Sequence, residues 1–322
     1  MRRGSIVAVA GVTALGVFAA VGVVVWRMGG LPPLTQGCRA EVAGHVVELD
    51  LEQAENAGLI AAVSVRRGLP ARAASIALAT AMQESKLRNL ESGDRDSLGL
   101  FQQRPSQGWG TQEEILNPYY ATNRFYDALV EVEGYDRMAI TAAAQEVQRS
   151  AYPDAYAKHE EDARALASAL TGETTGGAFS CRVRGGYGES STKLTAQGLT
   201  RRAATVRRDV EAVFGELSLG GFESGGVTSG HMTGSAHYDG RAIDIFVRPV
   251  SAATKQRGWA IAAYLVAEAD RLRIATVIFD GRIWRSGRFS DDGWLAYRVP
   301  SGSTGDRTVL EHRDHVHVDV AP

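Results

Sequence analysis

Hydrophobic and polar positions recur with different periods along the chain, and the changes in period divide it into segments. Residues 5–26 form an uncharged apolar run, and residues 49–170 show the three- to four-residue spacing of amphipathic helices. Residues 194–322 mix helical and strand patterns. Stretches rich in small residues at 29–48 and 171–193 separate these segments as linkers. The pattern predicts an all-α domain followed by an α+β domain.

The last segment carries enough strand signals to predict an antiparallel sheet with helices packed on it. In order, the expected elements are a helix with an apolar stripe at 206–217, a strand at 241–247, a helix at 255–271, and strands at 274–280 and 316–320. The final strand alternates three valines with His315, His317 and Asp319. Its valines therefore face the core, and its polar residues share the opposite face.

The N-terminal apolar run is long enough to cross a lipid bilayer. Its 22 residues would rise about 33 Å as a helix, and a hydrocarbon core is about 30 Å thick. Arg2 and Arg3 precede the run, which places the N-terminus in the cytoplasm and both domains outside it. No small-residue cleavage site follows, so residues 1–28 are expected to form an uncleaved single-pass membrane anchor. A buried core helix is the alternative.

Composition and charge narrow the choice of partners. The 322 residues correspond to roughly two domains. Lys and Arg number 35 against 37 Asp and Glu, a balance that argues against nucleic acid as a partner. Cys38 and Cys181 are too few for a disulfide-dense scaffold, but outside the cytoplasm one bridge could tie the ends of the helical domain. Two free thiols are the alternative.

Glu84 lies among apolar positions of a predicted helix. It shares one stripe of that helix with Ile76, Thr80 and Leu87. Burial on such a stripe raises the pKa of a carboxyl group and keeps it protonated near neutral pH, as a general acid requires. The alternative is a solvated face, where Glu84 pairs with Arg88 one turn further along the helix.

The residues after Glu84 resemble an active-site motif. Glu84-Ser85 is followed by Gly93-Asp94-Arg95 and then by Gly99-Leu100-Phe101-Gln102. This order resembles the lysozyme-like lytic transglycosylases and goose-type lysozymes, whose signature is Glu-Ser on a helix and then Gly-Leu-Met-Gln. The resemblance covers about residues 51–170. It departs from the family at Ala143-Ala144-Gln145, where Ala-Tyr-Asn is usual, with Gln145 or Gln148 as substitutes.

The resemblance implies that the substrate is the β-1,4 glycan of peptidoglycan and that Glu84 protonates the leaving oxygen. Gln102 and Gln103 would then hydrogen-bond the glycan or the acid. A hydrolase needs a second carboxylate, for which Asp94 matches the goose-type pattern, whereas a lytic reaction uses the sugar's own 6-hydroxyl. The lytic reaction is slightly favoured, because Gly-Asp is also a common turn sequence.

The C-terminal segment holds two groups of metal-ligating residue types. His237 precedes Asp244 by seven residues, and Asp244 lies on a predicted strand. With His317 from the final strand they form a set of three nitrogen and oxygen ligands that leaves a position for water, as in catalytic zinc sites. His315 would then serve as general base. The candidates to orient His315 through hydrogen bonds are His312, Asp314 and Asp319. A polar strand face without an ion is the alternative.

The two motifs together resemble a family of zinc enzymes. They read Ser-x-His-x-x-Gly-x-Ala-x-Asp at 235–244 and His-x-Asp-His-x-His-Val at 312–318. This pair resembles the zinc peptidases of the lysostaphin/D-Ala-D-Ala carboxypeptidase group, in particular the murein endopeptidases. The resemblance implies one Zn²⁺ on His237, Asp244 and His317, with His315 as base. Arg241 would contact an anion or carboxylate of the substrate, or it is a solvated charge at a strand edge.

Two hypotheses on function follow. The first is a membrane-anchored, extracytoplasmic peptidoglycan-remodelling enzyme that cleaves glycan strands in one domain and stem peptides or crosslinks in the other. The second is a non-catalytic cell-wall or metal-binding envelope protein that recruits or activates a partner hydrolase. Stoichiometric zinc would favour the first hypothesis. Retained activity but lost wall binding in Glu84→Gln would favour the second.

Overall fold

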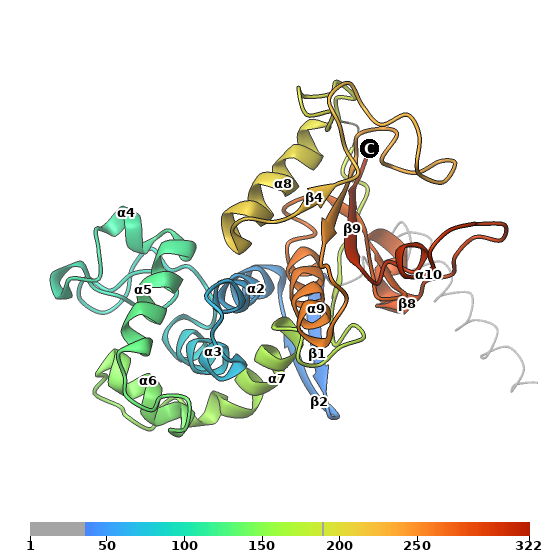
Figure 1. Cartoon of the computed structure of the whole chain (residues 1–322). Coiled ribbons are helices and arrows are strands. Elements are labelled where there is room, and N and C mark those ends of the chain that lie inside the picture. Colours follow the sequence, from blue (N-terminus) through green and yellow to red (C-terminus); the bar gives the residue numbers. More distant parts are fainter. Residues whose placement is uncertain (1–35, 189) are drawn as a thin grey trace, which may run out of the picture. The chain divides into compact units, whose positions relative to one another are not determined.

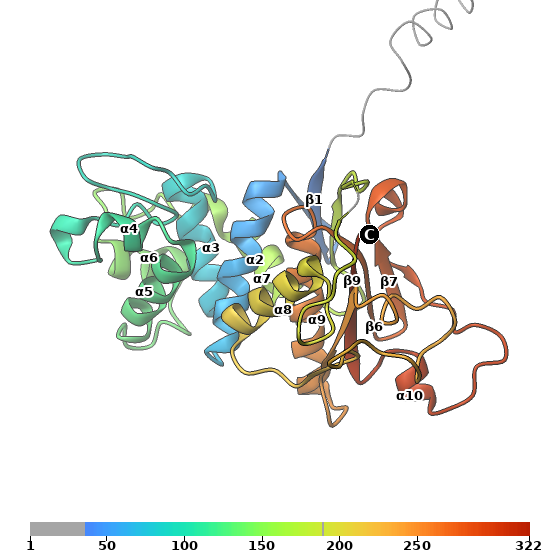
Figure 2. The ribbon, with the colours of Figure 1, turned by 90° about the horizontal axis from the view of Figure 1, so that it is seen from above.

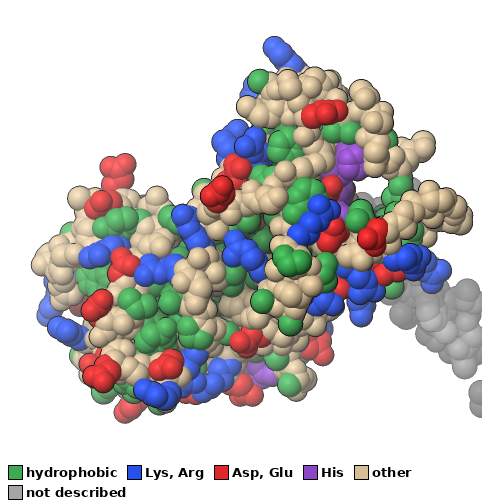
Figure 3. Space-filling view, in the orientation of Figure 1, with side chains coloured by type: hydrophobic (Ala, Val, Ile, Leu, Met, Phe, Trp, Pro, Cys, Tyr) green, Lys and Arg blue, Asp and Glu red, His purple; other side chains and the backbone are tan. Residues whose placement is uncertain are grey.

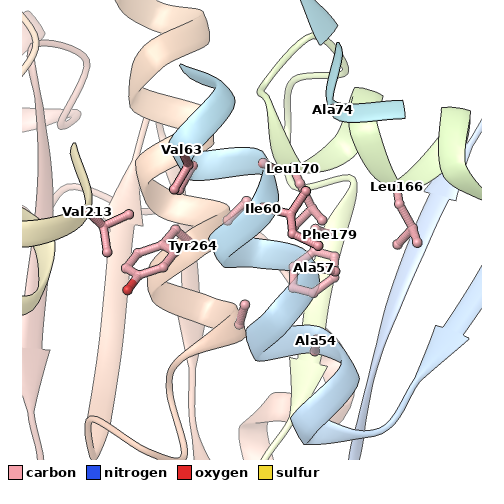
Figure 4. Close-up of a cluster of buried hydrophobic side chains, with 14 of the residues drawn as sticks. Ala54, Ala57, Ile60, Val63, Ala74, Leu166, Leu170, Phe179, Val213 and Tyr264 are labelled. Carbon is pink, nitrogen blue, oxygen red and sulfur yellow. The ribbon is translucent and has the colours of Figure 1, made fainter. Parts of the chain in front are cut away.

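Helix α2 (Leu51–Arg66) runs through the core in a computed structural model that describes residues 36–188 and 190–322. Asp50 caps its first turn by accepting a hydrogen bond from the Gln53 backbone, and the Gln53 side chain accepts one from the Asp50 backbone. Figure 4 shows the side chains of α2 pointing both toward Tyr264 and toward Leu170. This helix therefore joins the residues before 171 to those after 200 in one core.

The remaining helices before residue 171 surround one side of α2. They are α3 (Ala71–Ser85), α4 (Gln112–Ile115), α5 (Pro118–Val130), α6 (Ile140–Gln148) and α7 (Glu160–Leu170), with short 3-10 turns at Pro105–Gln107 and Ala157–His159. On the other side, α2 packs against α8 (Arg201–Phe214) and α9 (Ala252–Ala267). Figures 1 and 2 show α2, α8 and α9 side by side. Gly58 permits this approach, because a Cβ there would lie 3.0 Å from the Ala267 Cβ.

A small antiparallel sheet joins the two ends of the helical part, which comprises α2 to α7. Its strands are ordered β2-β1-β3 and comprise β1 (Gly37–Val42), β2 (His45–Leu49) and β3 (Phe179–Arg182). Cys38 and Cys181 face each other in the β1–β3 register and form a disulfide. The segments expected to be linkers thus contribute strands, and α9 packs on β3.

The large sheet is antiparallel and has the strand order β4-β5-β9-β6-β7-β8. Its strands are β4 (Leu219–Gly220), β5 (Ala242–Phe246), β6 (Ile274–Phe279), β7 (Arg282–Arg285), β8 (Leu295–Ala296) and β9 (His315–Val320). A 3-10 segment at Gly287–Asp292 and helix α10 (Arg307–Leu310) lie between its last strands. The valines of β9 are buried in the core, as the alternating pattern predicts.

The expected fold class needs correction. The anchor predicted at residues 1–28 lies outside the described residues. Across 36–188 and 190–322, no helix combines the length and apolar composition needed to cross a membrane. The longest helices of this part, α2 and α9, have 16 residues each, against about 20 for a span. The described residues thus give no support for a transmembrane helix or a single-pass membrane location, and their fold is mixed α/β.

A buried carboxyl group lies where α2, α8 and α9 meet. Glu268, directly after α9, is 3% exposed, and Arg271 Nε donates to its Oε2 at 2.6 Å. Arg271 also pairs with Asp209 of α8 at 2.7 Å. Burial raises the pKa of Glu268 to about 8, although the positive charge of Arg271 opposes this shift.

This shift predicts a loss of stability as the pH rises. The pKa of Glu268 is higher in the folded chain than the usual value of about 4.3, so the unfolded chain releases this proton first. The stabilising contribution is complete below about pH 4 and disappears as the pH approaches 8. Glu268→Gln should flatten the dependence of the free energy of unfolding between pH 5 and 8 in urea titrations. The exposed Glu216→Gln is the control, and an unchanged slope in Glu268→Gln would contradict the prediction.

Candidate functional site

Strands β5 and β9 bring the two polar motifs of the C-terminal segment together. Asp244 lies directly opposite His317 in their register, and Phe246 lies opposite His315. Both histidines and Asp244 are buried at a cavity of about 620 Å³, which His237 also lines. Figure 3 shows histidine side chains recessed on this face of the molecule. The alternating pattern of the last strand therefore places His315 and His317 on one face, as predicted.

Three of these side chains converge on one point. His237 Nε2 lies 3.1 Å from His317 Nδ1 and 3.3 Å from Asp244 Oδ1, and His317 Nδ1 lies 3.1 Å from Asp244 Oδ1. Atoms bound at 2.0–2.1 Å to one tetrahedral zinc ion lie about 3.3 Å apart. The three residues predicted as ligands thus fit three corners of a zinc tetrahedron.

The outer nitrogens of the two histidines have partners that fix the ring orientation. His237 Nδ1 donates to the Gly221 carbonyl at 2.6 Å, which leaves the Nε2 lone pair directed at the cluster. Gly221 has to be glycine here, because its φ is +76° and a Cβ would lie 2.3 Å from the His237 ring. His317 Nε2 lies 3.5 Å from Asp319 Oδ2, so one expected orienting residue supports a ligand rather than His315.

The ionisable groups of the cluster shift one another's pKa values. Burial acts to raise the pKa of Asp244, but the contacts with His237 and His317 outweigh it and hold the pKa far below its usual value. Burial acts to lower the pKa of His317, but its contacts with Asp244 and Asp319 raise it to about 9. Once His317 releases its proton, an anionic carboxylate between two imidazoles is a donor set suited to a divalent cation.

His315, the predicted base, lies beside the cluster of His237, Asp244 and His317. Its Nε2 is 3.8 Å from Asp244 Oδ1, which is further away than the three ligand atoms are from one another. Its Nδ1 donates to Asp314 Oδ1 at 2.8 Å, so Asp314 is the residue that orients it. The His312 ring lies tilted beside that of His315, with ring centroids 4.7 Å apart, and its Nδ1 has no hydrogen-bond partner among the described residues.

Two side chains at this cavity have surroundings that the sequence did not indicate. His231 stacks on His237 with ring centroids 3.9 Å apart, and its ligand atom lies within 4.8 Å of those of His237 and Asp244. Arg248 pairs with Asp314. Arg241, the expected anion contact, also lines the cavity, but its guanidinium bonds Asp239 and the Val320 carbonyl.

The helical part brings Glu84 next to the motif that follows it. Glu84 lies near the end of α3 and is half-buried. The next residue, Ser85, donates to the Leu100 carbonyl at 2.7 Å, which ties α3 to the Gly-Leu-Phe-Gln loop. Tyr156 Oη donates to Glu84 Oε1 at 2.8 Å. Burial and the neighbouring Glu84 both raise the pKa of Tyr156, so it keeps its proton and leaves the other Glu84 oxygen available.

The other residues predicted around Glu84 have different surroundings. Gln103 is buried and donates to the Ala121 carbonyl, and Gln102 donates to the Gly99 carbonyl. Gln148 donates to the Phe101 carbonyl at 2.8 Å, so this substitute residue lies beside the loop. The Asp94 side chain is 94% exposed. The sequence does not indicate the contact of Tyr156 with Glu84, because Tyr156 follows Glu84 by 72 residues and lies in an irregular stretch.

Comparison with known protein families gives a match over part of the chain. Residues 195–308, about a third of the chain, match the family model described as the VldE C-terminal domain, a peptidase-like domain family. The matched segment includes His237 and Asp244 and ends before His315 and His317. Neither a lysozyme-like nor a zinc-peptidase family is shown by this match. No curated protein matches the chain.

Proposed function

We propose that the C-terminal part is a zinc-dependent peptidase that cleaves the stem peptides or crosslinks of peptidoglycan. The observation that carries the proposal is the convergence of His237, Asp244 and His317 at mutual distances of 3.1–3.3 Å beside an oriented fourth residue, His315. The peptidase-like family match over residues 195–308 supports the reaction class. Peptidoglycan as the substrate rests on the resemblance of both halves of the chain to wall-cleaving enzymes.

The residues around the ligand set have complementary tasks in such a reaction. Bound zinc would polarise a peptide carbonyl and lower the pKa of water. His315 accepts the proton of the attacking water at Nε2 and delivers it to the leaving amine. Asp314 holds the Nδ1–H tautomer of His315 and stabilises the positive charge that the ring gains.

A second activity, glycan cleavage by the helical part, is favoured by the contact between Tyr156 and Glu84. Tyr156 fixes one carboxyl oxygen, and the partial exposure of Glu84 lets the other oxygen reach a glycosidic oxygen. Within the described residues, the exposed side chain of Asp94 makes no hydrogen bond and only approaches Arg95 at 3.9 Å, so no contact fixes it opposite Glu84. The arrangement therefore favours the lytic reaction, in which the sugar's 6-hydroxyl replaces a second carboxylate.

Metal content and product analysis test both activities in one experiment. The full-length protein is expected to bind one zinc ion per chain, measured by elemental analysis. Mass spectrometry of digested peptidoglycan should show cleaved stem peptides or crosslinks, which a chelator abolishes and added zinc restores. Glycan products with 1,6-anhydro ends should persist in the chelator.

Two results would change this conclusion. If the folded protein binds no zinc and yields no peptide products, the peptidase proposal fails. If it binds zinc but releases neither kind of product, the non-catalytic alternative replaces both activities, and binding of the intact protein to isolated cell wall becomes the relevant measurement.

A further inference from the structure

Arg248 lies two residues beyond the end of β5 and lines the cavity that holds His237, Asp244 and His317. Its Nε donates to Asp314 Oδ2 at 2.7 Å, its Nη2 lies 2.6 Å from the same oxygen, and its guanidinium stacks on Phe246 at 4.1 Å from the ring centroid. These contacts fix the plane of the guanidinium. The side chain nevertheless remains 51% exposed, so a positive charge is held rigidly at the open side of the cavity.

The hydrogen-bonding capacity of Arg248 exceeds what Asp314 uses. A guanidinium carries five N–H groups, and the shared Asp314 oxygen occupies one edge of it. Among the described residues no hydrogen bond from Arg248 Nη1 is formed. Because an Arg fork binds carboxylates with particularly favourable geometry, this remaining edge suits a carboxylate of a ligand.

Arg248 is connected to the proposed reaction centre through Asp314 and His315. Asp314 bonds Arg248 through one oxygen and His315 through the other, so one carboxylate and one imidazole separate the guanidinium from Asp244. The same cavity is also lined by the apolar side chains of Val309, which is 43% exposed, and Leu310, and by the ring of Tyr297. A peptide with a carboxylate near the scissile bond would match this combination of apolar wall and fixed cation.

Arg241 at the other end of β5 provides an internal comparison. Its Nη2 lies 2.8 Å from Asp239, its Nη1 donates to the Val320 carbonyl, and its side chain is 22% exposed. Arg241 therefore stabilises the end of the strand. The cation that the structure presents to a ligand is Arg248, four residues after Asp244, instead of the Arg241 expected from the sequence.

We propose that Arg248 forms a carboxylate-binding subsite that selects peptides with a carboxylate near the bond to be cleaved. This inference rests on the proposed peptidase function for its substrate class. The carboxylate is either the C-terminal one or that of an acidic side chain, because both present the same two oxygens to the guanidinium.

Calorimetric binding of short peptides to the full chain, kept free of zinc by a chelator so that no peptide is cleaved, tests the subsite. One pair of probes is acetyl-Lys-D-Ala-D-Ala and its C-terminal amide, and a second pair consists of amidated peptides that differ only in Glu against Gln. In the wild type, the carboxylate member of at least one pair should bind roughly 10- to 100-fold more tightly than its neutral partner. The pair that discriminates identifies the source of the carboxylate.

Variants separate a binding role from a structural one. Arg248→Gln should remove the discrimination with less than about a twofold effect on the neutral peptides, and Arg248→Lys should restore part of it. Arg241→Gln is the matched control and should keep the discrimination. Equal binding of both members of each pair by the wild type, including no binding, overturns the proposal. An equal loss of affinity for charged and neutral peptides in Arg248→Gln also overturns the proposal.

The same experiment distinguishes this proposal from the peptidase proposal. Because binding is measured without turnover, a chain that discriminates between the peptides but cleaves none supports the subsite and contradicts the peptidase. If the chain cleaves peptides but does not distinguish the charged from the neutral members of each pair, the peptidase proposal stands and the subsite proposal fails.

Discussion

Replacement of His317 by alanine is expected to weaken zinc binding more than about 100-fold, because removing even an outer partner of a metal ligand costs roughly 10- to 100-fold. His317 supplies one of three converging atoms, and its Nδ1 lies 3.1 Å from both other ligand atoms. The two remaining ligands cannot define a tetrahedral site. Peptide cleavage should fall by a larger factor than zinc affinity, because bound zinc would also be misplaced relative to His315. Competition with a chromogenic chelator and product release measure the two effects.

The control for this variant is His45→Ala. His45 Nε2 pairs with Asp162 in the helical part, at a distance of 2.8 Å, and lies outside the cavity. It should leave zinc affinity and peptide cleavage unchanged. If His317→Ala and Asp244→Ala both keep the wild-type zinc affinity, the ligand set is wrong, and His231 with its nearby nitrogen becomes the residue to examine.

The candidate ligands could be selected from the sequence because each lies in a local pattern. The alternation along β9 fixes which residues share a face, whichever strand lies next to it, so His315 and His317 are found on one side as predicted. The direct pairing of Asp244 with His317 could not be derived locally. It depends on the register between two strands whose facing residues lie 73 positions apart.

The residues that the sequence did not indicate depend on contacts between distant segments. Arg248 gains its role from Asp314, 66 residues further along the chain, whereas its own surroundings in the sequence show only a charge before a proline. The small sheet was not predicted, for the same reason. Its strands β1 and β3 have six and four residues, and Cys38 and Cys181 come together across 143 positions. Such short strands carry too weak a pattern to be distinguished from linkers.

Replacement of Glu84 by glutamine is expected to abolish the release of glycan fragments while leaving peptide cleavage unchanged. An amide cannot donate the proton that the departing sugar oxygen needs, and general acid catalysis contributes roughly 100- to 10,000-fold. Glutamine keeps the side-chain length and can still accept the hydrogen bond from Tyr156 that now reaches Glu84 Oε1 at 2.8 Å. The fold should therefore be retained, and zinc content in the same sample checks the other half of the chain.

Two companion variants decide how the reaction proceeds. Asp94→Asn should leave the yield of 1,6-anhydro products unchanged, because the Asp94 side chain is 94% exposed and lies on a loop with few contacts. A hydrolase would instead lose activity in Asp94→Asn and produce reducing sugar ends. Tyr156→Phe should lower the rate without changing the product, because it frees one carboxyl oxygen but leaves the acid itself in place. If Glu84→Gln still releases glycan fragments at the wild-type rate, Glu84 is not the acid, and its position at the end of α3 is structural.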